Sequence, residues 1–164
     1  QDGDADGELD VTIGAGTSSV TTVVGDLAVN GDTTTFSSAN TTDPVVIIKN
    51  TTNDANGARL QLVKDKGAAG ANDDVNGLLQ FIGDGANEDQ VTFSEIKSQV
   101  AVATNGEEGG KLTLSVAEHD GTLTAGLVIQ DGDADGELDV TIGAGTSSVT
   151  TCLLYTSPSP RDRG

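Results

Sequence analysis

Residues 1–22 read QDGDADGELDVTIGAGTSSVTT, and the same letters recur without a change as residues 130–151. The two copies begin 129 residues apart, so the chain contains slightly more than one full period of a tandem repeat. A period of this length is too long for one rung of a solenoid and suits a row of domain-sized modules. Such an array favours a structural or adhesive role, since an enzyme seldom needs consecutive identical copies of its site.

Apolar and polar residues alternate within the repeated stretch, at residues 9–13 (LDVTI) and in the copy at 138–142. Alternation with a period of two is typical of a strand that buries one face. The same pattern occurs at residues 60–63, 91–96 and 112–116, and residues 45–48 and 78–82 are typical of more fully buried strands. Since no segment carries an apolar stripe at helical spacing, the sequence predicts an all-β protein with little helix.

Asn-Gly pairs punctuate the chain at residues 30–31, 56–57, 76–77 and 105–106. Both residue types tolerate a positive φ, so each pair predicts a turn or hairpin. The stretch 67–76, which consists mainly of Gly, Ala, Asn and Asp, predicts a surface loop.

Differences in amino-acid composition divide the chain into segments along the repeat. They are residues 1–22 (end of the preceding repeat and connector), 23–42 (extended Thr/Gly/Val connector), 43–129 (β-rich module), 130–151 (start of the next copy) and 152–164 (tail). We expect the module to be an antiparallel β-sandwich or jelly-roll-like unit. Its expected core consists of Ile47, Leu60, Leu62, Leu79, Phe81, Phe93, Ile96, Leu112, Leu114 and Val128.

The connector has short Val and Leu segments and almost no aromatic bulk over residues 19–36. A single chain can bury little of it, so we expect an extended segment in which Val23, Leu27 and Val29 are exposed. Three chains wound around one axis would cover both the apolar side chains and the unpaired strand edges.

The tail departs from the repeat at Cys152, where the first copy continues with VVGDLAVNG. Residues 152–162 (CLLYTSPSPRD) resemble the in-frame translation of a sequencing adapter. We therefore expect a metagenomic gene fragment with a non-native tail that joins no sheet, and a natural Pro-rich tail is the alternative. The tail contains the chain's only Cys, so we expect neither a disulfide nor a thiolate metal site.

The formal net charge of −18 bears on the partners of the protein. Nucleic acid would be repelled, because binding to it requires a Lys/Arg footprint. We also expect no membrane insertion, since the longest purely aliphatic run covers only residues 45–48. The acidic surface favours solubility and attracts cations.

One acidic motif has the spacing of a cation-binding loop. Asp131, Asp133 and Asp135 alternate before Gly136 and Asp139 occupies the ninth loop position, with the same motif at Asp2, Asp4, Asp6 and Asp10. Alternate carboxylates in a tight turn can converge on Ca²⁺. The twelfth position is Ile142, where a bidentate Glu would be needed. A weak Ca²⁺ site and a solvated acidic turn both stay open, and no other cofactor is expected.

Two further features have the residue types of catalytic groups. His119, the only histidine, lies in a predicted hairpin turn over residues 118–121, and one His without Cys cannot form a zinc site alone. Glu107 and Glu108 are adjacent carboxylates of the kind that act as acid and base in glycoside hydrolysis. Because acidic turns occur throughout this chain, we expect exposed turn residues and no enzymatic activity.

The connector and the module both resemble parts of bacteriophage tail fibres, especially those of marine phages. Residues 23–36 (VVGDLAVNGDTTTF) are similar to their Thr/Gly/Val connector repeats. Residues 44–100 resemble a β-rich fibre module, with Gly77, Phe81 and Gly83 at the family's positions, and residues 110–121 match the strand that follows. The resemblance covers roughly residues 9–142. It implies homotrimers with strand-rich modules along a fibre axis; the family's self-cleaving C-terminal chaperone has no counterpart here.

The resemblance implies a structural component of a virion tail fibre that spaces and presents host-attachment surfaces. The implied partners are two further copies of the chain, other tail proteins and a host surface glycan. Two alternatives remain open. One is a bacterial surface or secreted adhesin whose repeats are made rigid by Ca²⁺, and the other is a tailspike-like glycan hydrolase.

Overall fold

The structure, a computed structural model, describes residues 13–14, 16, 19–143 and 145–151 of the chain. The chain divides into two units, residues 1–51 and residues 52–164. The predictions for the tail at residues 152–164 and for the strand at residues 9–13 lie outside the described residues, apart from Ile13.

The first unit contains neither strand nor helix among its described residues. The side chains of Val23, Leu27 and Val29 are 51%, 73% and 56% exposed, so the predicted exposure of the connector is confirmed. The strand predicted at residues 45–48 is wrong for this chain. A strand needs a hydrogen-bonded neighbour, and no pairing is recorded for this segment in the described part of the chain.

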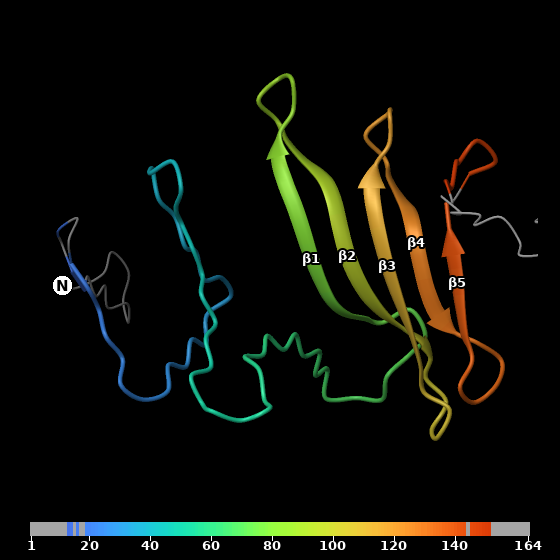
Figure 1. The fold of residues 1–164 in the computed structure, drawn as a ribbon, viewed down its shortest axis with the longest axis horizontal. Helices are drawn as coiled ribbons and strands as arrows, with labels where there is room; N and C mark the ends of the chain where they lie inside the picture. Colours follow the sequence, from blue (N-terminus) through green and yellow to red (C-terminus); the bar gives the residue numbers. More distant parts are fainter. Residues whose placement is uncertain (1–12, 15, 17–18, 144, 152–164) are drawn as a thin grey trace, which may run out of the picture. The chain divides into compact units, whose positions relative to one another are not determined.

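The second unit is built around one five-stranded antiparallel sheet (Figure 1). Its strands are β1 (Val75–Asp84), β2 (Gln90–Val102), β3 (Gly109–Ala117), β4 (Leu123–Asp131) and β5 (Leu138–Ile142). Each strand pairs with the next in the chain, so the sheet is an open meander with β1 and β5 at its edges. The all-β prediction is confirmed: the described residues contain no helix, and hence none that could cross a membrane.

Four of the predicted strands coincide with observed ones. Residues 78–82 lie in β1, residues 91–96 in β2 and residues 112–116 in β3, while the repeated LDVTI at 138–142 is β5. The strand predicted at residues 60–63 is wrong, since these residues precede β1 and do not belong to a strand. The described residues therefore form a single sheet without a second layer of strands, and the predicted sandwich is not seen in this part of the chain.

Two of the predicted turn sites connect strands of the sheet. Asn105–Gly106 forms the β2–β3 turn, in which Gly106 has a φ of 84°, a value that favours glycine. His119 lies in the β3–β4 turn as predicted. The turn predicted at Asn76–Gly77 is wrong: the pair lies inside β1, where the register with β2 shifts between Val75 and Gly77. Glycine there accommodates an irregular strand rather than a reversal.

The strand register sorts the side chains into two faces, because successive residues point to opposite sides of a sheet. We call one the apolar face and define it by two rows that cross all five strands. They are Leu79, Ile96, Leu114, Leu127 and Ile142, and Gly77, Ser98, Leu112, Ile129 and Val140. We call the other the polar face; its central rows include Glu95, Lys97, Thr113 and Ser115.

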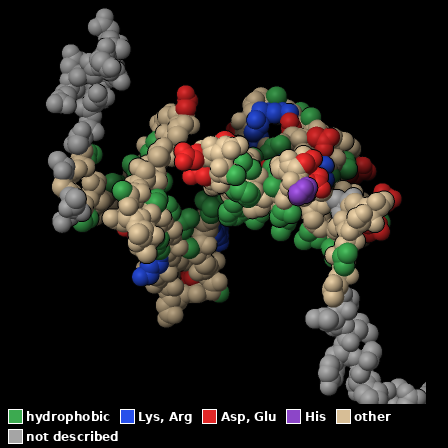
Figure 2. Space-filling model, turned by 90° about the horizontal axis from the view of Figure 1, so that it is seen from above, with side chains coloured by type: hydrophobic (Ala, Val, Ile, Leu, Met, Phe, Trp, Pro, Cys, Tyr) green, Lys and Arg blue, Asp and Glu red, His purple; other side chains and the backbone are tan. Residues whose placement is uncertain are grey.

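A sheet usually buries its apolar face and exposes its polar face, whereas in this sheet the buried side chains lie on the polar face. Glu95, Thr113 and Ser115 are the buried side chains of the polar face, with 8%, 8% and 6% exposure. No hydrophobic side chain is buried among the described residues, and Figure 2 shows hydrophobic side chains on the molecular surface. The predicted core is therefore wrong for the single chain, as the 55% exposure of Phe81 illustrates. The reason is the missing second layer over the apolar face.

Candidate functional site

The predicted cation loop connects β4 to β5. Asp131 is the last residue of β4, and Asp139 lies within β5 opposite Gln130. The loop is closed by its own bonds: the Glu137 N–H donates to the Ala134 carbonyl at 3.0 Å, and the Asp133 N–H donates to Glu137 Oε2 at 3.1 Å. Glu137, which the motif did not single out, is thus the carboxylate that organises the loop.

The four aspartates of this motif do not form a ready-made ligand set. Among the described residues, no group of three or more His, Cys, Asp or Glu side chains is placed to hold a metal ion. Asp131 is turned toward β3, where its carboxylate occupies the space that a Cβ on Gly109 would take. The first copy of the motif lies outside the described residues, and Ca²⁺ binding stays a prediction for both copies.

The β2–β3 and β4–β5 loops together form an acidic end of the sheet. Glu107 and Glu108 from the first loop and Asp133 and Asp135 from the second line a hollow of about 530 Å³. Glu108 Oε2 accepts a hydrogen bond from the Gly106 N–H at 3.0 Å, so this carboxylate stabilises its own turn. The concentration of negative charge attracts cations to this end of the sheet. The absence of enzymatic activity stays a prediction.

His119 is exposed in a turn that is held by its neighbours (Figure 2). The Glu118 N–H donates to the Thr122 carbonyl at 2.9 Å, and the Thr122 N–H donates to Asp120 Oδ1 at 2.9 Å. The bond from the Thr122 N–H lowers the pKa of Asp120. The acidic residue Asp120 therefore stabilises the turn in which it lies.

A polar anchor near the start of β1 was not anticipated from the sequence. The Asp73 N–H donates to the Val100 carbonyl at 2.8 Å, and Lys111 Nζ lies 3.2 Å from Asp73 Oδ1. Asp74 Oδ2 lies 2.5 Å from Lys66 Nζ and accepts a bond from the Ala71 N–H at 2.8 Å. The bond from Lys66, followed by that from Ala71, lowers the pKa of Asp74. The anchor ties the predicted 67–76 loop to β2 and β3.

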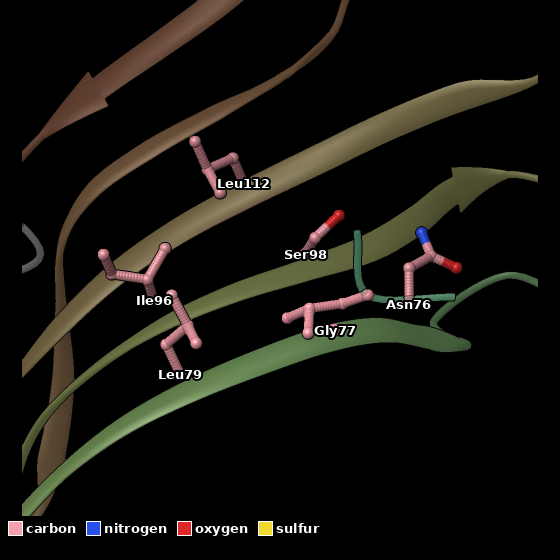
Figure 3. Close-up of a pocket in the computed structure, with 7 residues that line it drawn as sticks. Asn76, Gly77, Leu79, Ile96, Ser98 and Leu112 are labelled. Atoms are coloured by element: carbon pink, nitrogen blue, oxygen red, sulfur yellow. The ribbon is translucent and has the colours of Figure 1, made fainter. Parts of the chain in front are cut away.

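The apolar face has a shallow hollow of about 140 Å³ at one corner (Figure 3). Leu79, Ile96 and Leu112, from three adjacent strands, line it together with Leu62 from the segment before β1. A Cβ added at Gly77 would lie 2.9 Å from the Cβ of Leu62, so Leu62 lies directly over this glycine. Among the described residues, Leu62 covers this corner of the apolar face, and the β5 edge of the face is exposed.

The membership of the apolar face could have been read only in part from the sequence. Val128 was expected in the core, but it pairs with Thr113 on the polar face, and its neighbours Leu127 and Ile129 are on the apolar face. In the run Leu127–Val128–Ile129 all three residues are apolar, so alternation alone cannot show which of them lie on the apolar face.

Comparison with protein-family models, with curated proteins and with solved structures finds no match for this chain.

Proposed function

We propose that this chain is a repeat segment of a bacteriophage tail fibre, a virion component that spaces and presents host-attachment surfaces. One observation carries the proposal: a sheet with a five-strand apolar face buries no hydrophobic side chain within the described chain. Moving a half-exposed Leu or Ile to full burial contributes about 1 kcal/mol. A protein with so many of these side chains in the open is stabilised by assembly.

The repeat supports an array of equal modules. Gly14 and Gly143, which are equivalent in the two copies, have φ values of 79° and 80°. The Ser19 N–H donates to the Gly16 carbonyl at 3.0 Å, and its equivalent, the Ser148 N–H, donates to the Gly145 carbonyl at 3.0 Å. Identical sequence thus adopts the same local turn in both units, as a linear repeat requires.

In the proposed fibre the chain is a homotrimer joined to other tail proteins, and arrayed copies make weak contacts with a host glycan effective. The predicted sandwich belongs to this assembly, in which a neighbouring chain supplies the second layer over the sheet. The function is mechanical, and we propose no enzymatic activity.

Sedimentation equilibrium of two tandem copies of residues 1–129 tests the proposal, and we expect the mass of a trimer. The genes that flank the coding sequence provide an independent test. Capsid, baseplate or terminase genes support the virion role. A compact monomer, together with neighbouring genes for surface anchoring, would contradict it.

The adhesin alternative is favoured by one observation, the acidic loop between Asp131 and Asp139 with its carboxylates at alternate positions. In an adhesin, Ca²⁺ would make this loop rigid and would raise the melting temperature. Calcium titration therefore separates the two candidates.

A further inference from the structure

The charged residues of the sheet are distributed unevenly between its faces. The two rows of the apolar face contain no charged side chain, whereas Glu95, Lys97 and Lys111 belong to rows of the polar face. The chain as a whole carries a net charge of −18. Two copies repel each other wherever their acidic surfaces meet, so the uncharged face is where they approach at the lowest electrostatic cost.

The size of the apolar face also suits association between copies. Five strands about 4.8 Å apart, with two rows that each take up about 7 Å of strand, make a face of roughly 340 Å². Three such faces turned toward one axis remove about 1,000 Å² from water, which is the size at which specific protein interfaces begin.

The described part of the chain does not cover this face itself. Leu62 is the residue that reaches the hollow from outside the sheet, and it lies over Gly77 at the corner. In the middle of the face Leu112 and Leu114 remain 38% and 37% exposed. Toward the β5 edge Val140 and Ile142 are 58% and 60% exposed.

We propose that the apolar face is the surface through which copies of this chain associate, with the sheets of three copies turned toward one axis. The inference rests on the proposed trimeric fibre and names the contact within it. Leu114 and its row neighbours Ile96 and Leu127, on the three central strands, form the middle of that contact.

Leu79 and Gln80 provide a matched pair for the test. They are successive residues of β1, both are exposed in the single chain, and they point to opposite faces. We expect Leu79→Lys to weaken self-association by at least about tenfold in sedimentation equilibrium, because a buried Lys would lose its hydration. Gln80→Lys introduces the same residue type on the polar face, and we expect that it does not weaken association.

Cross-linking keeps the test independent of folding defects. In a Cys152→Ser background, Leu114→Cys is expected to be joined between copies by a short bismaleimide, and Gln80→Cys is not. Equal association of Leu79→Lys and wild type, or cross-linking only at Gln80→Cys, would overturn the inference while leaving the trimer intact. Association through the edges of β1 or β5 would give that result. A wild-type chain that is monomeric at all concentrations would instead overturn the proposed function.

Discussion

At the scale of single residues, the structure shows glycine making room for a neighbouring chain segment. Gly77 was expected in a turn, yet it lies in β1 beneath Leu62. The absence of a Cβ lets Leu62 reach the apolar face at this point. Asp74 is a second case: its carboxylate accepts bonds from Lys66 and Ala71 and closes the loop before β1.

Gly77→Ala is expected to displace Leu62 from the apolar face. The added Cβ would lie 2.9 Å from the Cβ of Leu62, and the unpaired segment that carries Leu62 can move away at little cost. The free energy of unfolding is expected to change by no more than about 1 kcal/mol. Methyl NMR of Leu62 is the measurement, and Gly110→Ala in β3 is the control because its added Cβ meets nothing within 4 Å. Unchanged Leu62 signals in Gly77→Ala would contradict the contact.

Asp74 is expected to titrate below the ordinary aspartate value of 3.8, since Lys66 and the Ala71 N–H stabilise its charged form. A lowered pKa in the folded state gives stability that is present above the unfolded pKa and is lost as the pH falls through the folded pKa. The loop before β1 should therefore loosen as the pH falls through the lowered pKa of Asp74. Carboxyl ¹³C NMR measures the titration, and Lys66→Met should move the midpoint upward. A wild-type midpoint at or above 3.8 would refute the assignment.

At the scale of elements, the β4–β5 loop and its acidic partner loop form one end of the sheet. Glu137 accepts a hydrogen bond from the Asp133 N–H in the β4–β5 loop, and the Asp131 carboxylate is turned toward Gly109. The loop of this hairpin is therefore held by its own hydrogen bonds.

Millimolar Ca²⁺ is expected to raise the melting temperature no more than Mg²⁺ does, because the described carboxylates do not gather into a ligand set. Differential scanning calorimetry at constant ionic strength is the measurement. A rise specific to Ca²⁺ that is lost in Asp133→Asn would contradict this expectation and would favour the adhesin.

At the scale of the whole molecule, the proposed contact between copies is uncharged, while the chain carries a net charge of −18. Added salt screens repulsion over a Debye length of about 10 Å at 0.1 M and leaves apolar burial in place. We therefore expect self-association to strengthen between low salt and 0.5 M NaCl.

Sedimentation velocity across a salt series measures this effect. An association that weakens steadily with salt would show that ion pairs hold the copies together and would contradict the apolar contact. Gln80→Lys, which removes one unit of net negative charge away from the proposed contact, should make the salt dependence slightly shallower.

The sequence by itself determined the β class, β5 and the central parts of β1, β2 and β3, and the hairpin turns at residues 105–106 and 118–121. These features are local, since alternation and turn residues act over a few positions along the chain. The exposure of Val23, Leu27 and Val29 was also predicted from local sequence, because residues 19–36 contain few large side chains that could cover them.

Only the tertiary structure decided what each strand faces. It placed Val128 on the polar face, kept residues 45–48 and 60–63 out of the sheet, and left Phe81 in the open. Each of these depends on a partner far away in the chain or outside it: register comes from pairing with another strand, and burial comes from a second layer. Alternation shows that a strand has an apolar side, and what covers that side is a property of the assembly.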